Sequence, residues 1–288
     1  MSSLVGTGAL VRLALRRDRI LIPVFLIILV VMVAAAAYAT ADLYPDTASR
    51  VDAATAVNSA TGTLAMFGPI HDVTSLGALS TFKMGIMGAI AVAVLVLFIV
   101  VRHTRAEEET GRLEMLGATV VGRRAPLTAA LLVAGGTSVA AGVLTTLGLI
   151  ASGMPVTGSL ISGAGYACLG IAFAAVAGLT AQLTRSARAA VGIGGLVLGV
   201  AYLLRAVADV VDGVGWLTWL SPVGWWQQAR PYAGDRWWPL VLLLGFAAVA
   251  SALAYVFAAR RDFAAGLLPD RPGPATAAPG LRSPLALA

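Results

Sequence analysis

All four glutamates of the chain lie in one short stretch, 102–124, which reads RHTRAEEETGRLEMLGATVVGRR. Arginines are interleaved with them, and long apolar runs flank the stretch on both sides. As a helix, it would pair Arg105 with Glu109 and Glu108 with Arg112, at an i,i+4 spacing worth about 0.3–0.5 kcal/mol per pair. The pattern fits a short amphipathic helix that docks into a groove on a soluble partner, and the absence of energy-coupling chemistry elsewhere in the sequence favours this interpretation. A solvated hairpin between two membrane spans is the alternative.

Residues for other kinds of chemistry are missing from the sequence. The phosphate-binding pattern GxxxxGK[ST] does not occur, and the single lysine, Lys83, stands in TFKMG. No HExxH motif occurs, and the only two histidines, His71 and His103, are far apart in the sequence. Cys168 is the only cysteine, which excludes an intrachain disulfide. We therefore expect no catalytic residue, metal or cofactor on this chain, and no ATPase site of its own.

The composition is that of an integral membrane protein. Of the 288 residues, 59% are hydrophobic and only 12% are charged, whereas about 25% of a soluble domain is charged. The net charge of +6 could suggest a nucleic-acid partner. The arginines, however, cluster at the ends of apolar runs without interleaved aromatics, which is how cations flank membrane spans. The sequence therefore predicts an all-α membrane protein that contacts lipid and binds no nucleic acid.

Six apolar runs are close to the roughly 20 residues that a helix needs to cross a bilayer. We expect the spans at 20–39, 84–101, 126–150, 161–183, 189–211 and 238–259. A cleaved secretory signal is the alternative for the first, but its apolar core exceeds the roughly 7–15 residues of a signal. The remaining segments are an interfacial helix at 1–19, an external segment of short helices at 41–83, the loop 102–124, a broken aromatic segment at 212–237 and a Pro/Ala-rich tail at 260–288.

The distribution of cations predicts the orientation. Fifteen of the twenty Lys and Arg residues fall in the N-terminal segment, the loop 102–124, the turn 184–188 and the tail. Short cytosolic segments carry an excess of Lys and Arg. We therefore expect both termini, and the loop, in the cytosol.

Two features inside the fifth span call for an explanation. Arg205 is a charge within an apolar run, and Asp209 follows one helical turn later, so the two are expected to form an intramembrane ion pair. A structural pair, or an arginine that reaches the outer interface, is one interpretation, and a substrate gate is the other. Gly195 and Gly199 form a GxxxG motif that predicts close helix packing, within the subunit or between two halves of a permease.

The stretches RHTRAEEETGRLEMLGATVVGRRAPLTAALL and LSPVGWWQQARPYAGDRWWPL, with the order of the segments, resemble type-2 ABC exporter permeases. More specifically, they are similar to actinobacterial exporters of polyketides and other antibiotics. The resemblance implies a bacterial plasma-membrane permease that exports an apolar or amphipathic compound, driven by a separate ATP-binding subunit that carries ATP and Mg. It also implies a coupling helix whose docking residues are Glu107, Glu108, Glu109, Gly111, Arg112, Leu113 and Glu114.

The resemblance further implies a second six-span half. The tail 260–288 is similar to the linker between two such halves, so the chain is interpreted either as a half-length permease that dimerises or as the first half of a longer protein. Two functions outside this family remain as alternatives. One is a secondary transporter, although no acidic residue lies deep in a span. The other is a membrane scaffold or assembly protein that transports nothing.

Overall fold

The computed structural model describes residues 3–111 and 121–260, and all regular secondary structure in this part of the chain is helical. Six helices are long and apolar enough to cross a membrane: α2 (Leu21–Leu43), α5 (Leu76–His103), α8 (Ala125–Ala151), α9 (Val156–Leu183), α10 (Ala187–Val210) and α12 (Trp238–Arg260). Lipid offers no hydrogen bonds to the backbone, so each apolar run must satisfy its own N–H and C=O groups as a helix. The predicted all-helical fold with six candidate spans is confirmed.

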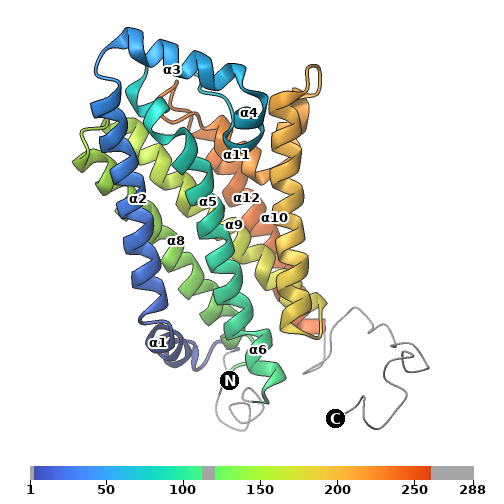
Figure 1. Ribbon diagram of the computed structural model, residues 1–288. Helices are drawn as coiled ribbons and strands as arrows, with labels where there is room; N and C mark the ends of the chain where they lie inside the picture. The colour runs from blue at the N-terminus through green and yellow to red at the C-terminus, as the bar shows by residue number, and fades with distance from the viewer. Residues whose placement is uncertain (1–2, 112–120, 261–288) are drawn as a thin grey trace, which may run out of the picture.

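Shorter helices lie at the two ends of the bundle (Figure 1). We call one the α6 end, because α1 (Thr7–Arg17) and α6 (Arg105–Glu109) lie there with the turn between α9 and α10. We call the other the α4 end, because α3 (Thr47–Ser59) and α4 (Thr61–Phe67) cross it. The aromatic segment between α10 and α12 folds into η1 (Gly215–Leu220) and α11 (Pro222–Gln228), on the same side as α4.

Two long helices begin earlier than the apolar runs indicated. Helix α5 begins at Leu76 rather than at residue 84, because the Ser75 hydroxyl caps it by accepting from the Ala78 N–H at 3.2 Å. The polar Thr81 is buried, and its hydroxyl donates a hydrogen bond to the Gly77 carbonyl at 2.8 Å within the same helix. Helix α9 begins at Val156 rather than at 161. Hydropathy underestimates helices whose first turns carry small polar residues.

Helix α9 forms the centre of the bundle and is the most buried of the six long helices. It packs against α8, α12 and α5, and many of its buried residues are glycine or alanine. It lies close to α8 at Gly163, where an added Cβ would fall well inside van der Waals contact with the Gly142 carbonyl and the Thr146 hydroxyl. Small residues at a crossing of this kind let two helix backbones come together in lipid.

The GxxxG motif of α10 faces away from this core. A Cβ added at Gly195 or Gly199 would meet no atom of the described residues within 4 Å, and both positions are exposed. The glycine that does pack is Gly194, whose added Cβ would meet the Leu97 side chain at 2.6 Å. Among the described residues, the motif therefore packs against no other helix of the subunit. An interface between two six-span units remains as a proposal.

Candidate docking end and transport face

A buried aspartate joins α1, α2 and α5 at the α6 end. Asp18 lies between α1 and α2, and its side chain is fully buried. Its carboxylate forms an ion pair with Arg102 Nη1 at 2.8 Å and lies 2.6 Å from His103 Nε2. Both partners belong to the last turn of α5, immediately before α6. Helix α1 is thereby fixed to the point where the chain leaves the bundle.

The glutamates of α6 contact different elements. Glu107 accepts from the Arg17 guanidinium of α1, and Glu109 accepts from the Ala187 N–H of α10 at 2.7 Å. Glu108 pairs with Arg105, which is buried and also donates to the Thr184 carbonyl. The expected Arg105–Glu109 pair is therefore wrong, because the first turn pairs at i,i+3 and leaves Glu109 to reach the start of α10.

The rest of the predicted coupling loop is described only in part. Gly111 adopts a left-handed conformation (φ 70°), which ends α6. Arg112, Leu113 and Glu114 lie outside the described residues, and so does the expected Glu108–Arg112 pair. Where the chain is described again, the Gly122 N–H donates to the Val5 carbonyl at 2.9 Å. The loop therefore starts and ends against the N-terminal segment.

The fixation of α1 gives a first prediction. Replacing Asp18 with alanine would leave Arg102 and His103 without their buried carboxylate, which typically costs about 1–3 kcal/mol. We expect faster hydrogen exchange in α1 and a lower melting temperature of the detergent-solubilised protein. The control is Asp42→Ala, which removes an exposed aspartate at the opposite end of α2. Equal exchange in both variants would show that Asp18 does not hold α1.

A large apolar cavity opens between α5 and α10 near the α6 end. Its volume is about 620 Å³, within the range of about 300–1,000 Å³ typical of small-molecule sites. Leu95 and Phe98 of α5 and Val191 of α10 form apolar walls, and Leu21 of α2 also lines the cavity. Its two charged lining residues are Arg102 and Arg188. Sequence reasoning missed this cavity, because its walls come from segments far apart in the chain.

Arg205 and Asp209 form the expected ion pair near the α4 end, with 3.1 Å between Arg205 Nη1 and Asp209 Oδ2. Arg205 is completely buried, and its Nη2 donates to the carbonyls of Ala65 at 2.9 Å and Met66 at 3.0 Å. Gln227 of α11 donates to both Asp209 oxygens at 3.0 Å. One charge pair therefore ties α10 to the last turn of α4 and to α11.

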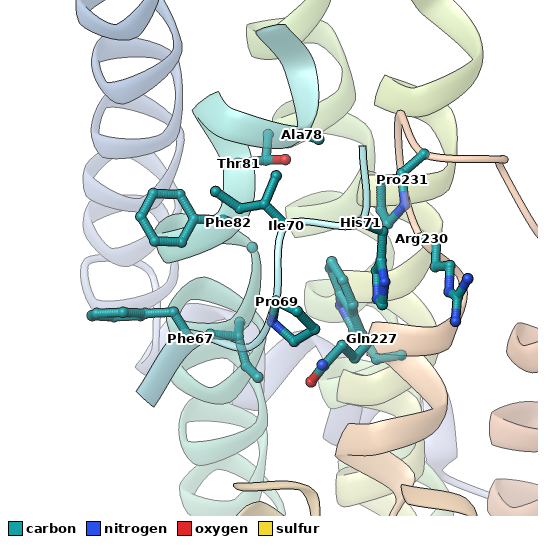
Figure 2. A pocket seen from close by; sticks show the side chains of 14 residues that line it. Phe67, Pro69, Ile70, His71, Ala78, Thr81, Phe82, Gln227, Arg230 and Pro231 are labelled. Atoms are coloured by element: carbon teal, nitrogen blue, oxygen red, sulfur yellow. The ribbon is translucent and has the colours of Figure 1, made fainter. Parts of the chain in front are cut away.

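A small pocket, lined mainly by apolar residues and by a few polar atoms, lies beside this network (Figure 2). Its volume of about 60 Å³ has room for about two water molecules. Trp226 Nε1, Gln227 Oε1 and Arg230 Nε are buried there without a hydrogen-bond partner among the described residues. At the same pocket, partial desolvation and the charges of Arg230 and Arg236 lower the pKa of His71, although the residue as a whole is exposed. His71 is therefore neutral at pH 7. Water molecules in the pocket could form hydrogen bonds with the unpaired polar atoms.

The described residues thus form a helical bundle with six candidate membrane spans and shorter helices at both ends (Figure 1). An apolar cavity opens on one face of this bundle. Within the described residues, no cluster of three or more His, Cys, Asp or Glu side chains could hold a metal ion.

Comparison with known proteins gives the family. The family model described as "Multidrug efflux system permease Rv1217c, C-terminal domain" matches residues 9–257, so the chain belongs to this family. The whole chain is also 45% identical, over 288 residues, to the multidrug efflux system permease protein Rv1217c of Mycobacterium tuberculosis (strain ATCC 25618 / H37Rv). The chain spans 52% of the length of that relative. The resemblance to exporter permeases is confirmed, and the protein is a membrane permease homologue.

Proposed function

We propose that this chain is a transmembrane part of an ATP-driven exporter, and that a separate subunit binds and hydrolyses ATP with Mg. The observation that carries this proposal is the arrangement of α6. The charged helix is bonded both to α1, through Glu107, and to the start of α10, through Glu109. A hairpin that only connects two spans does not need contacts of this kind. A helix that transmits a movement of the ATP-binding subunit to the spans does need them.

The orientation follows from the cations. The described cations at the α6 end include Arg12, Arg16 and Arg19 of the N-terminal segment, together with Arg185 and Arg188 near the start of α10. An excess of this kind is typical of the cytosolic side. We therefore place the α6 end in the cytosol, where an ATP-binding subunit would meet it, and the α4 end outside.

In this proposal, movement of the loop 102–124, which contains α6, is transmitted directly to α5 and α10, the helices on either side of the cavity. Helix α6 follows α5 after a single residue, and Arg105 and Glu109 connect it to the turn before α10 and to its first residue. A displacement of α6 would therefore change the spacing between α5 and α10, which form the walls of the cavity. Rigid-body shifts of packed helices are a common way to switch a site between two states.

The cavity also supports the kind of cargo. Its walls are almost entirely apolar, so it suits an apolar or amphipathic compound. One side of it is open: Phe98 lies on its wall and is 51% exposed. We propose that a second six-span unit covers this face and completes a pathway. The name of the relative, a multidrug efflux permease, is consistent with cargo of this kind.

Co-purification tests the proposal directly. The chain is expressed with the ATP-binding subunit from the same locus, and the intact chain is expected to retain that subunit. A variant with Arg112, Leu113 and Glu114 changed to alanine is expected to lose at least about tenfold of the bound subunit, because interface residues at the contact centre dominate binding. Changing Glu107, Glu108 and Glu109 to alanine is expected to do the same and also to loosen α1.

The matched control is Asp42→Ala, at the opposite end of the bundle, which should retain the subunit fully. If the intact chain retains no subunit, even when a second six-span unit is supplied, the exporter proposal is wrong. Flux that collapses with an ionophore but survives ATP depletion would indicate a secondary transporter instead.

A further inference from the structure

The cavity between α5 and α10 is polarised along its length. Arg102 stands in the last turn of α5 and Arg188 in the first turn of α10, so both guanidinium-bearing residues lie at the α6 end of the cavity. Leu95 lies two turns deeper along α5, which corresponds to about 10 Å at 1.5 Å per residue. The cavity therefore has an apolar body and one cationic end.

The two arginines differ in how well their charge is compensated. Arg102 shares the buried Asp18 carboxylate with His103. Arg188 is exposed and forms no ion pair within the parts of the chain that the structure describes. The cationic end of the cavity thus keeps a positive charge that can accept an anionic partner. Guanidinium groups bind carboxylate and phosphate oxygens through charge-assisted hydrogen bonds.

From this geometry we infer that the cavity takes anionic amphiphiles: compounds with an apolar body and one carboxylate or similar anionic group, which Arg188 binds. This inference rests on the proposed export function and specifies its substrate class. The apolar body lies against Leu95, Phe98 and Val191, and the anionic group lies at the cytosolic end. A neutral compound with the same body occupies the same walls without the contribution of Arg188.

The test uses the complete transporter, with its second six-span unit and ATP-binding subunit, in inside-out proteoliposomes. The probes are pyrenebutyrate, which is anionic at pH 7, and pyrenebutanol, a neutral compound with the same apolar body. Stimulation of ATP hydrolysis gives the half-saturating concentration of each probe. Arg188→Gln is expected to raise the half-saturating concentration of pyrenebutyrate about threefold to tenfold, as loss of one hydrogen bond of ordinary net strength does at an exposed arginine. The half-saturating concentration of pyrenebutanol should stay unchanged.

Two controls make the result specific. Arg16→Gln removes an exposed arginine of α1 that does not line the cavity, and it should affect neither probe. Val191→Trp fills the apolar part of the cavity, and it should weaken both probes together. If Arg188→Gln shifts both probes equally, or shifts neither, the inference is wrong.

A lipid headgroup could satisfy the same guanidinium, and vesicle composition separates the two occupants. If the intact transporter requires phosphatidylglycerol and Arg188→Gln removes that requirement without changing the response to pyrenebutyrate, the site holds a lipid and the inference is wrong. Failure of the export function itself has another signature, namely no ATP-dependent accumulation of either probe. In that case, fluorescence anisotropy of pyrenebutyrate bound to the purified chain, with and without Arg188→Gln, still decides whether the cavity selects an anion.

Discussion

Replacing Arg205 with methionine is expected to lower the free energy of unfolding by about 3–5 kcal/mol, because the change leaves the buried Asp209 carboxylate without its counter-charge. Three backbone carbonyls at the end of α4 also lose a donor, since Arg205 reaches those of Leu64, Ala65 and Met66. The measurement is the melting temperature of the detergent-solubilised protein, together with the yield of monodisperse protein.

Two further variants show which interaction accounts for the effect of Arg205→Met. Changing Asp209 to leucine in the Arg205→Met background is expected to recover part of the loss, because removing both charges avoids an unpaired buried one. Arg236→Ala removes an exposed arginine near the same end and should change stability by less than about 0.5 kcal/mol. A stable Arg205→Met protein that has lost export would favour the substrate-gate interpretation. Unchanged stability and unchanged export would contradict both roles.

Replacing Gly163 with alanine is expected to destabilise the bundle by about 1–3 kcal/mol or more, because the new methyl group overlaps the backbone of α8 at Gly142. Neither helix can rotate away easily, since α9 is packed on several sides by α8, α12 and α5. Thermal unfolding followed by size-exclusion chromatography measures the loss. A Gly163→Ala protein as stable as the parent would contradict this close packing of α8 and α9.

The matched control for this change is Gly195→Ala, because no described atom would lie near the added methyl group. Its stability should stay within about 0.5 kcal/mol of the parent. The bulkier Gly195→Leu then addresses the proposed interface. If the exposed face of α10 contacts a second six-span unit, this change should weaken their association and leave the melting temperature of the isolated unit unaltered.

The sequence was sufficient for the features that depend on local spacing. Six helices follow from apolar runs whose backbone has no alternative in lipid. The pairing of Arg205 with Asp209 follows from their separation by one helical turn. The interruption of the segment 212–237 follows from its prolines, and α11 indeed begins at Pro222.

Features that depend on helix rotation or on distant segments could not be predicted in this way. Which glycine of α10 packs inward, Gly194 or Gly195, is decided by a rotation of one residue about the helix axis. Glu109 bonds to Ala187, a residue 78 positions away, so its local pairing with Arg105 was a reasonable but wrong expectation. The cavity between α5 and α10 likewise appears only when the two helices are placed side by side.

The position of Asp209 on the same helix as Arg205 bears on how the protein enters the membrane. A lone charge costs about 2.5–3.5 kcal/mol on insertion at the centre of a span, and this value is an upper limit for Arg205, which lies near the end of α10. Because its counter-charge lies one turn away, α10 can enter the bilayer with Arg205 already neutralised, before any tertiary contact forms. The carbonyls of Ala65 and Met66 at the end of α4 are synthesised much earlier than α10. They accept hydrogen bonds from Arg205 only after α10 has been synthesised and has packed beside α4. Assembly of the α4 end therefore waits for the fifth span.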